Sequence, residues 1–178
     1  MILSVGHSDR TASELVALLS AHQVAHLCDV RSLPRSRRHP QFERAALTRT
    51  LAAAGIAYEW WGDRLGGLRK PRADSPNRAL LEPGFRGFAD YMQTPSFHAA
   101  AVALIDTATN QVTALLCAEA AHEQCHRRFI ADYLQLHGVA VAHIVDQQTC
   151  VPHRLHPALD DGSDPPVYNN HPQGDLFA

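Results

Sequence analysis

Apolar residues along the chain recur in two ways, as short uninterrupted runs and at helical spacing. The apolar runs predict strands at residues 2–5, 24–30, 56–61, 112–116 and 139–145. The helical spacing predicts a helix that begins near Thr11 or Ser13 and further helices at 42–54, 85–92, 96–108 and 125–137. Gly55 and Gly138 follow two of these helices and are suited to end them.

Strands and helices that alternate in this way predict an α/β fold, with a mostly parallel sheet of about five strands and helices on both faces. We expect the α/β domain to cover residues 1–146. Beyond it the chain is polar and rich in proline, so we expect residues 147–178 to form a tail that lies on the surface or is disordered. Residues 62–84 are rich in glycine, proline and arginine and have the composition of a long functional loop.

Composition is typical of a globular protein, since 46% of the 178 residues are hydrophobic. No apolar run is long enough to span a bilayer, and the first residues lack the features of a signal peptide. We therefore expect a cytoplasmic protein whose four cysteines are reduced thiols. The net charge of -2 argues against nonspecific coating of nucleic acid, but basic residues gather between Arg31 and Arg78 and allow a local basic cleft.

Polar side chains follow the predicted strands at the point where each strand ends. They are His7 and Ser8 after the first strand, Asp29, Arg31, Ser32, Ser36 and Arg37 after the second, Arg64 after the third, and Cys117 and Glu119 after the fourth. Ligands of open parallel sheets bind at the carboxyl ends of the strands. We therefore expect the functional site at this edge of the sheet.

These segments resemble a bacterial family, the Domain of Unknown Function 488. The motifs that carry the resemblance are Gly6-His7-Ser8, Asp29-Val30-Arg31-Ser32, Leu65-Gly66-Gly67, Tyr91-Met92, and Cys117-Ala118-Glu119 with Cys125-His126-Arg127. They arrive in the family's order and cover residues 2 to about 145. The name of the family states that its activity is unassigned, so the resemblance implies no particular chemistry.

Arginine and serine side chains predict that the carboxyl edge of the sheet binds an anion. Guanidinium groups and hydroxyl groups together can satisfy phosphate or carboxylate oxygens. The expected anion- or substrate-binding residues are Ser8, Arg31, Ser32, Ser36, Arg37, Arg64 and Arg127. Two adjacent tryptophans, at 60 and 61, precede a second basic stretch between Arg64 and Arg78, and aromatic rings beside cations suit single-stranded nucleic acid. We expect one of these tryptophans to belong to the core.

The candidate catalytic residues are His7, Asp29, Cys117, Glu119 and His126, and they allow more than one chemistry. Cys117 could be a nucleophile, with His126 or His7 as its base. Glu119 could instead be the nucleophile or general base on a glycosidic or phosphoester substrate, with Asp29 as a partner carboxylate. The sequence leaves both interpretations open.

A third interpretation gathers Cys117, Cys125 and His126 around a zinc ion, with His7 as an optional further ligand. The spacing between the two cysteines is wider than in the usual short zinc motifs, so the sequence does not favour zinc and we predict no cofactor. Free cysteines are often buried core residues, which is the simpler interpretation of both. Most of the twelve histidines, including His153 and His156, are expected on helix surfaces or in loops without a functional role.

The last six residues resemble the peptide by which bacterial repair and replication proteins bind the DNA polymerase sliding clamp. Gln173, Asp175, Leu176 and Phe177 match that motif, and Gly174 departs from it. A flexible, proline-rich tail is a suitable setting for a peptide that becomes ordered on binding. We therefore expect the sliding clamp as a partner.

Taken together, these features favour a DNA-maintenance or nucleic-acid-processing protein that the sliding clamp recruits. If it is an enzyme, we expect a hydrolase or transferase that acts on a nucleotide or nucleic acid. One alternative is a non-catalytic module that binds nucleic-acid ends. Another is a small-molecule enzyme that acts on nucleotides or sugar phosphates.

Overall fold

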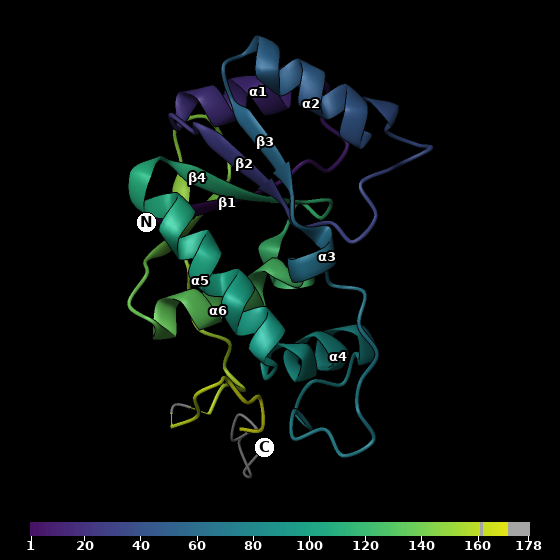
Figure 1. Ribbon diagram of the computed structural model, residues 1–178, viewed down its shortest axis with the longest axis vertical. Coiled ribbons are helices and arrows are strands. Elements are labelled where there is room, and N and C mark those ends of the chain that lie inside the picture. The colour runs from purple at the N-terminus through teal and green to yellow at the C-terminus, as the bar shows by residue number, and fades with distance from the viewer. Residues whose placement is uncertain (161, 171–178) are drawn as a thin grey trace, which may run out of the picture.

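Six strands form one sheet in the computed structural model, which describes residues 1–160 and 162–170 (Figure 1). They are β1 (Ile2–Gly6), β2 (His26–Asp29), β3 (Ala57–Trp60), β4 (Thr113–Cys117), β5 (Val141–Ile144) and β6 (Cys150–Pro152). Their order is β3-β2-β4-β1-β5-β6, with parallel pairing throughout except between β5 and β6. The predicted α/β class with a mostly parallel sheet is confirmed, and the antiparallel edge strand β6 is an addition that the apolar pattern did not indicate.

Six α-helices connect these strands within the described residues. They are α1 (Ala12–Ala21), α2 (Arg44–Ala53), α3 (Gly62–Leu65), α4 (Pro83–Met92), α5 (Pro95–Asn110) and α6 (Arg127–Leu136). Thr11 and Glu14 form a capping box at the start of α1, because each side chain accepts a hydrogen bond from the other's backbone N–H. None of the described helices is long and apolar enough to cross a membrane.

Helices cover both faces of the sheet. On one face, α1 and α2 bury Leu15 and Leu47 against Leu27 of β2 (Figure 1). On the other face, α5 and α6 bury Phe97 and Phe129 in a second apolar cluster. Side chains of β1, β2, β4 and β5 contribute to both clusters, as expected of strands that are covered on both sides, whereas the edge strands β3 and β6 contribute to one cluster only.

After the neighbouring strands β2 and β4, the chain continues toward opposite edges of the sheet. From β2 it continues to the edge strand β3, whereas from β4 it continues through α6 to β5 on the far side of β1. Such a divergence opens a crevice at the carboxyl ends of the two strands, where ligands of open α/β sheets bind. The residues after β2 and β4 therefore occupy the place in the fold best suited to a site.

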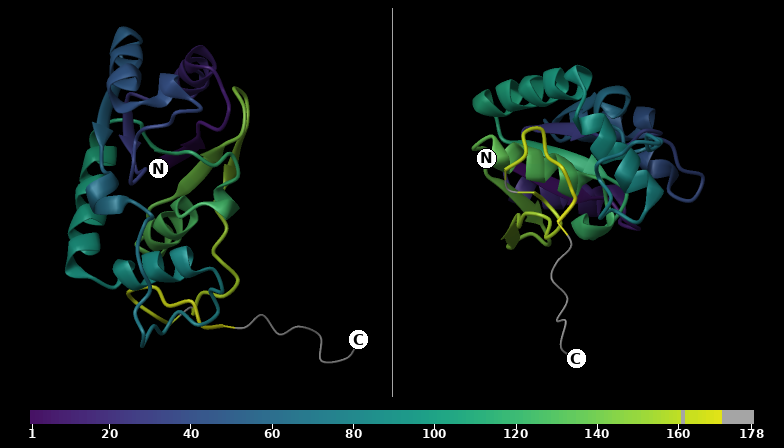
Figure 2. Two further views of the ribbon diagram at one scale, coloured as in Figure 1. Left: turned by 90° about the vertical axis from the view of Figure 1, so that its right-hand side faces the viewer. Right: turned by 90° about the horizontal axis from the view of Figure 1, so that it is seen from below.

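Residues 150–160 and 162–170 belong to the fold, in contrast to the surface or disordered tail expected from composition. Tyr168 is fully buried, and its hydroxyl group donates to Asp132 of α6 at 2.9 Å. Its backbone N–H donates to Asn77 in the loop before α4. Figures 1 and 2 show this segment, in yellow, lying beside that loop. The difference arises because apolar residues such as Leu159 and Tyr168 lie singly among polar residues, without a period that reveals their burial.

Candidate functional site

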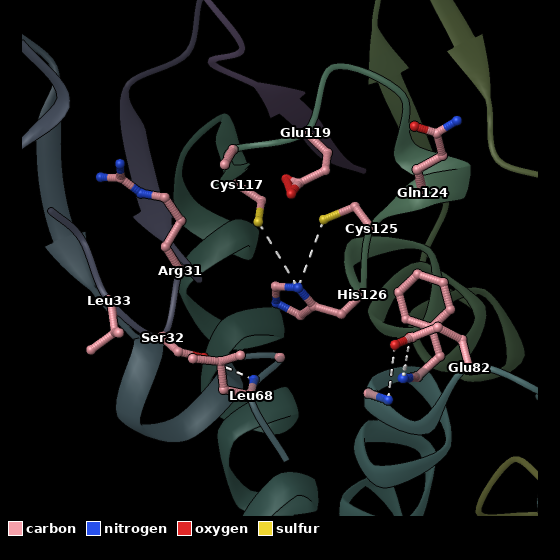
Figure 3. A pocket seen from close by; sticks show the side chains of 14 residues that line it. Arg31, Ser32, Leu33, Leu68, Glu82, Cys117, Glu119, Gln124, Cys125 and His126 are labelled. Carbon is pink, nitrogen blue, oxygen red and sulfur yellow. Dashed lines mark hydrogen bonds between the residues drawn. The ribbon is translucent and has the colours of Figure 1, made fainter. Parts of the chain in front are cut away.

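A pocket of about 600 Å³ opens at the carboxyl ends of β2 and β4 (Figure 3). Its lining residues come from four parts of the chain, namely Arg31, Ser32 and Leu33 after β2, Gly67 and Leu68 after α3, Glu82, Gly84 and Phe85 at the start of α4, and Cys117 to Glu119 with Gln124 to His126 after β4. This is the edge of the sheet at which the sequence predicted the site. The volume is in the range of small-molecule and cofactor sites.

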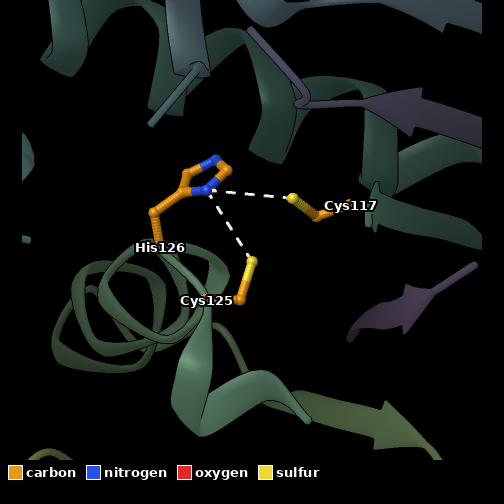
Figure 4. A group of neighbouring side chains, drawn as sticks. All are labelled: Cys117, Cys125 and His126. Atoms are coloured by element: carbon orange, nitrogen blue, oxygen red, sulfur yellow. Dashed lines mark hydrogen bonds between the residues drawn. The ribbon is translucent and has the colours of Figure 1, made fainter. Parts of the chain in front are cut away.

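Two cysteines and a histidine meet at this pocket. The Nδ1 atom of His126 lies 3.9 Å from the sulfur of Cys117 and 3.7 Å from the sulfur of Cys125 (Figure 4). Cys117 ends β4, whereas Cys125 and His126 immediately precede α6, so the fold closes a gap of nine residues in sequence. All three side chains are buried, and their ligand atoms lie within 4.8 Å of one another.

The orientation of the His126 ring makes Nδ1 a free acceptor. Its Nε2 atom lies 3.1 Å from the carbonyl oxygen of Leu65, which can only accept a hydrogen bond. The ring proton is therefore on Nε2, and the Nδ1 lone pair faces the two sulfurs. Metal-binding histidines typically donate their second ring N–H to a carbonyl or carboxylate in this way.

The two thiols differ in acidity because they share one proton. The hydrogen bond from Cys117 lowers the pKa of the Cys125 thiol, and His126 and Arg127 add to this effect against the cost of burial. The Nε atom of Arg127 donates to the Cys125 sulfur at 3.3 Å. Donation to Cys125 and burial raise the pKa of Cys117. Cys28, by contrast, lies in the core, where burial raises its thiol pKa to about 12.

The Cys117–Cys125–His126 group could hold a metal ion. Two sulfur ligands and one imidazole ligand are a combination found in catalytic zinc sites, which keep a fourth position open for water or substrate. Here the open side faces the pocket, because all three residues contribute to its lining. The wide spacing between the cysteines, which argued against zinc in the sequence, is no obstacle once β4 and the start of α6 lie side by side.

Glu119 and Arg127 occupy different surroundings. Glu119 is exposed at the pocket, its carboxylate makes no side-chain hydrogen bond to a described residue, and Figure 3 shows it turned toward the two sulfurs. Arg127 is only 1% exposed and donates to the Ser4 hydroxyl and the Glu119 carbonyl oxygen. Its guanidinium is therefore a support for the loop and for Cys125, and it is not free for the anion contact expected from the sequence.

Asp29, Arg31 and His7 form a bonded network behind the pocket. Arg31 donates to both carboxylate oxygens of Asp29, at 2.9 and 2.5 Å, and Tyr58 donates to the same carboxylate at 2.7 Å. His7 donates from Nδ1 to the Ser8 carbonyl oxygen, so its Nε2 accepts from Arg31 at 3.2 Å. Burial lowers the pKa of His7 to about 4.

This network corrects two expectations about catalysis. Asp29 is completely buried and its oxygens already accept four hydrogen bonds, so it is not a free partner carboxylate for Glu119. His7 does not line the pocket, and its only lone pair is directed at Arg31 and away from the thiols. Both residues position Arg31, which does line the pocket.

The remaining expected anion-binding residues are divided between the pocket and the surface. Ser32 lines the pocket, but its hydroxyl oxygen accepts from the Leu68 backbone N–H. Arg37 is exposed and makes no side-chain hydrogen bond to the described part of the chain, so it is available to a ligand. Ser8, Ser36 and Arg64 lie outside the pocket lining, and their side chains contact Asp9, the His39 backbone N–H and Glu59 respectively.

Two features of the pocket were not found from the sequence. Phe85 and Glu82 reach it from the start of α4, where the Glu82 carboxylate accepts from the backbone N–H groups of Gly84 and Phe85. Gly67 allows the close approach of His126, because a Cβ atom at Gly67 would lie 2.6 Å from the ring Nδ1. The glycine pair at 66–67 was a signal for such an approach, whereas nothing in the pattern marked Phe85.

The fold and the pocket together define a class, namely α/β proteins with a mostly parallel sheet and a Cys–Cys–His group at the switch point of that sheet. Comparison with family models finds a match over residues 11–134 to the family described as Domain of unknown function DUF488. The match covers more than half of the chain, and the chain therefore belongs to this family. No curated protein matches the chain, and no solved structure matches it.

Proposed function

We propose that this protein is a zinc-dependent hydrolase that acts on a nucleotide or a nucleic acid. The observation that carries the proposal is the convergence of Cys117, Cys125 and His126 on one point at the inner end of an open pocket. Three protein ligands with a fourth side open to a pocket favour a catalytic over a closed structural zinc site. A zinc ion held there would supply Lewis acidity and lower the pKa of a water molecule.

Glu119 is the residue best placed to move the proton in such a reaction. It follows Cys117 by two residues, is exposed in the pocket, and has no competing side-chain partner among the described residues. We assign it the role of general base and then general acid. Glu119 accepts one proton from water as the oxygen attacks the substrate, and it returns that proton to the leaving group as the old bond breaks.

The lining of the pocket supports a substrate with a flat ring, and an exposed arginine on the loop beside it supports a negative charge. Leu33, Leu68 and Phe85 provide apolar walls, which suit the face of a nucleobase. Arg31 lines the pocket but its guanidinium is bound to Asp29 and His7, whereas Arg37 lies exposed on the same loop. An exposed arginine in this position suits the phosphate groups of a nucleotide.

Recruitment to DNA by the sliding clamp remains part of the proposal, and it is supported by sequence alone. The peptide that carries it, with Gln173, Asp175, Leu176 and Phe177, lies outside the described residues. Binding of the full chain and of a Leu176→Ala/Phe177→Ala variant to a purified clamp tests it. Micromolar binding that the variant loses would support recruitment, and no binding by either chain would remove it.

A hydrolysis assay tests the proposed function. The zinc-loaded protein is incubated with free nucleotides and with single-stranded and damaged oligonucleotides, and product is measured by chromatography. We expect the Glu119→Gln variant to keep its zinc and to lose turnover by about 100-fold or more. The exposed glutamate Glu43 provides a matched control, since Glu43→Gln leaves the pocket unchanged.

The assay also distinguishes metal-dependent hydrolysis from a mechanism in which a cysteine thiol is the nucleophile. A chelator should abolish turnover, and added zinc should restore it. If Cys117 or Cys125 were the nucleophile instead, turnover would survive the chelator and would be lost on alkylation. Full turnover by Glu119→Gln, or no turnover on any nucleotide or nucleic acid by the zinc-loaded protein, would contradict the proposal.

A further inference from the structure

Three histidines from separate segments gather on the other side of the loop that carries Glu119. His122 belongs to the short 3-10 helix η2 (His122–Gln124), His143 to β5, and His153 follows β6. One ring nitrogen of each lies within 4.8 Å of those of the other two. The Nε2 atom of His143 lies 3.0 Å from the Nδ1 atom of His153. Two nitrogens that share a zinc ion at about 2.0–2.1 Å have a similar separation, about 3.3 Å for tetrahedral geometry.

A carboxylate holds the His153 ring in the orientation of a metal ligand, and a second carboxylate lies near His122. The Nε2 atom of His153 lies 2.8 Å from the carboxylate of Asp132, which leaves Nδ1 free to face His143. The Nδ1 atom of His122 lies 3.4 Å from the carboxylate of Glu123, which leaves its Nε2 free. Carboxylate–histidine pairs of this kind fix the tautomer and raise the basicity of metal-binding imidazoles.

The third ring shows that the cluster is incomplete as a set of hydrogen bonds. His143 is 3% exposed, and its Nδ1 atom is buried with no partner among the described residues. The nitrogen that faces His153 is Nε2, so His143 would bind an ion through Nε2 and would carry its ring proton on Nδ1. His122 stacks on His143 with ring centroids 3.5 Å apart. Its imidazole is 21% exposed, so it has room to rotate into the plane of a shared ion.

We propose that His122, His143 and His153 form a second metal site, for a divalent ion of the zinc type. Three imidazoles suit Zn²⁺ and its neighbours in the first transition row. The proton between His143 and His153 would move to Nδ1 of His143 when the ion binds, because Nε2 of His143 and Nδ1 of His153 then donate their lone pairs to it.

The position of His122 in the chain indicates what the second metal site does. The η2 helix lies between Glu119 and Cys125, so the ion would link the loop at 118–126 to β5 and to the segment after β6. Gln124 and Glu119, which line the pocket, belong to the same loop. The second ion therefore positions the pocket loop. This inference stands apart from the proposed hydrolysis, since it uses none of the residues at 117, 125 and 126.

Cobalt substitution of the full chain tests the second site and separates it from the first. Co²⁺ bound by cysteine gives a thiolate charge-transfer absorption, whereas Co²⁺ bound by three histidines does not. We expect the wild-type chain to bind two equivalents of Co²⁺. The His122→Gln variant should bind one, with the thiolate absorption retained and with affinity at the second site lowered by more than about 100-fold.

His137→Gln serves as the matched control, because His137 is similarly exposed, at 27%, and lies outside the cluster. The control should bind two equivalents. A Cys117→Ser/Cys125→Ser variant should still bind one equivalent, without thiolate absorption, and this result would hold even if the proposed hydrolysis were wrong. Unchanged stoichiometry in His122→Gln, or no Co²⁺ bound by the cysteine variant when circular dichroism shows that it is folded, would overturn the second site.

Discussion

At the scale of single residues, the loop that begins at Arg31 contains one arginine that protein groups hold and another that is exposed and able to bind a ligand. Arg31 is 6% exposed and shares its guanidinium among Asp29, His7 and the Phe42 carbonyl oxygen. Arg37 lies six residues later on the same loop and is exposed. A buried pair contributes little when both partners are present, but the loss of one partner leaves an uncompensated charge. The two arginines should therefore respond very differently to the same substitution.

Replacement of each arginine by methionine makes this comparison. We expect Arg31→Met to lower the free energy of unfolding by about 3–5 kcal/mol, because Asp29 is then buried without its cation. Arg37→Met should change it by less than about 0.5 kcal/mol and should weaken nucleotide binding instead. Urea unfolding followed by circular dichroism measures both. Equal stability of the two variants would show that Arg31 is not part of a buried pair.

The acidity of His7 leads to a prediction about pH. Burial lowers the pKa of His7 to about 4 in the folded chain, whereas the unfolded chain keeps a value near 6.5. Between these values the unfolded state binds more protons, so stability falls as the pH decreases from 6.5 to 4. A His7→Gln variant should show a flatter dependence over this window. The free energy of unfolding measured at several pH values tests this, and equal slopes for the two chains would refute it.

The sequence could predict those site residues that lie at the end of a strand. It was less informative about residues that belong to other elements and reach the pocket only through the tertiary fold. Cys117, Glu119 and Arg31 follow buried strands, and the structure brings them to one pocket. The sequence could not place Phe85, because its position depends on how α4 folds back over the crevice. Nor could it mark His143 and His153, since a lone histidine in a strand or a polar segment gives no periodic signal.

At the scale of elements, the site depends on close contact between the turn of α3 and the start of α6. His126 donates to the Leu65 carbonyl oxygen, and Gly67 lies against the His126 ring. Glycine is required here for the space it leaves, since no other residue lacks a Cβ atom. The sequence indicated a loop at 62–84 but not the short helix within it, because four residues are too few to show a helical period.

Gly67→Ala tests this contact. The new Cβ atom would lie 2.6 Å from His126 Nδ1, so the ring must move away from the two sulfurs. We expect zinc affinity to fall by about 10- to 100-fold, the range seen when the support of a metal ligand is disturbed. Gly162→Ala is the control, because a Cβ atom there has its nearest described contact at 3.7 Å. Competition with a chromophoric chelator measures both, and equal affinities would contradict the role of Gly67.

At the scale of the whole molecule, strand order decides where the site forms. The alternation of strands and helices predicted the class of fold, but it could not predict that β4 inserts between β1 and β2. That insertion depends on contacts between residues far apart in sequence, such as Leu115 of β4 with Ser4 of β1 and Cys28 of β2. It also creates the crevice in which the Cys117 and Arg31 segments meet.

The central claim is that Cys117, Cys125 and His126 hold one zinc ion, and zinc analysis of the purified chain tests it most directly. Each chain is saturated with zinc, passed over a desalting column, and measured for zinc and protein. We expect Cys117→Ser/Cys125→Ser to retain one zinc ion fewer per chain than Cys150→Ser, in which a half-buried cysteine outside the group is replaced. This difference would persist whether or not the histidine cluster is occupied. Equal zinc content in the two variants would contradict the claim.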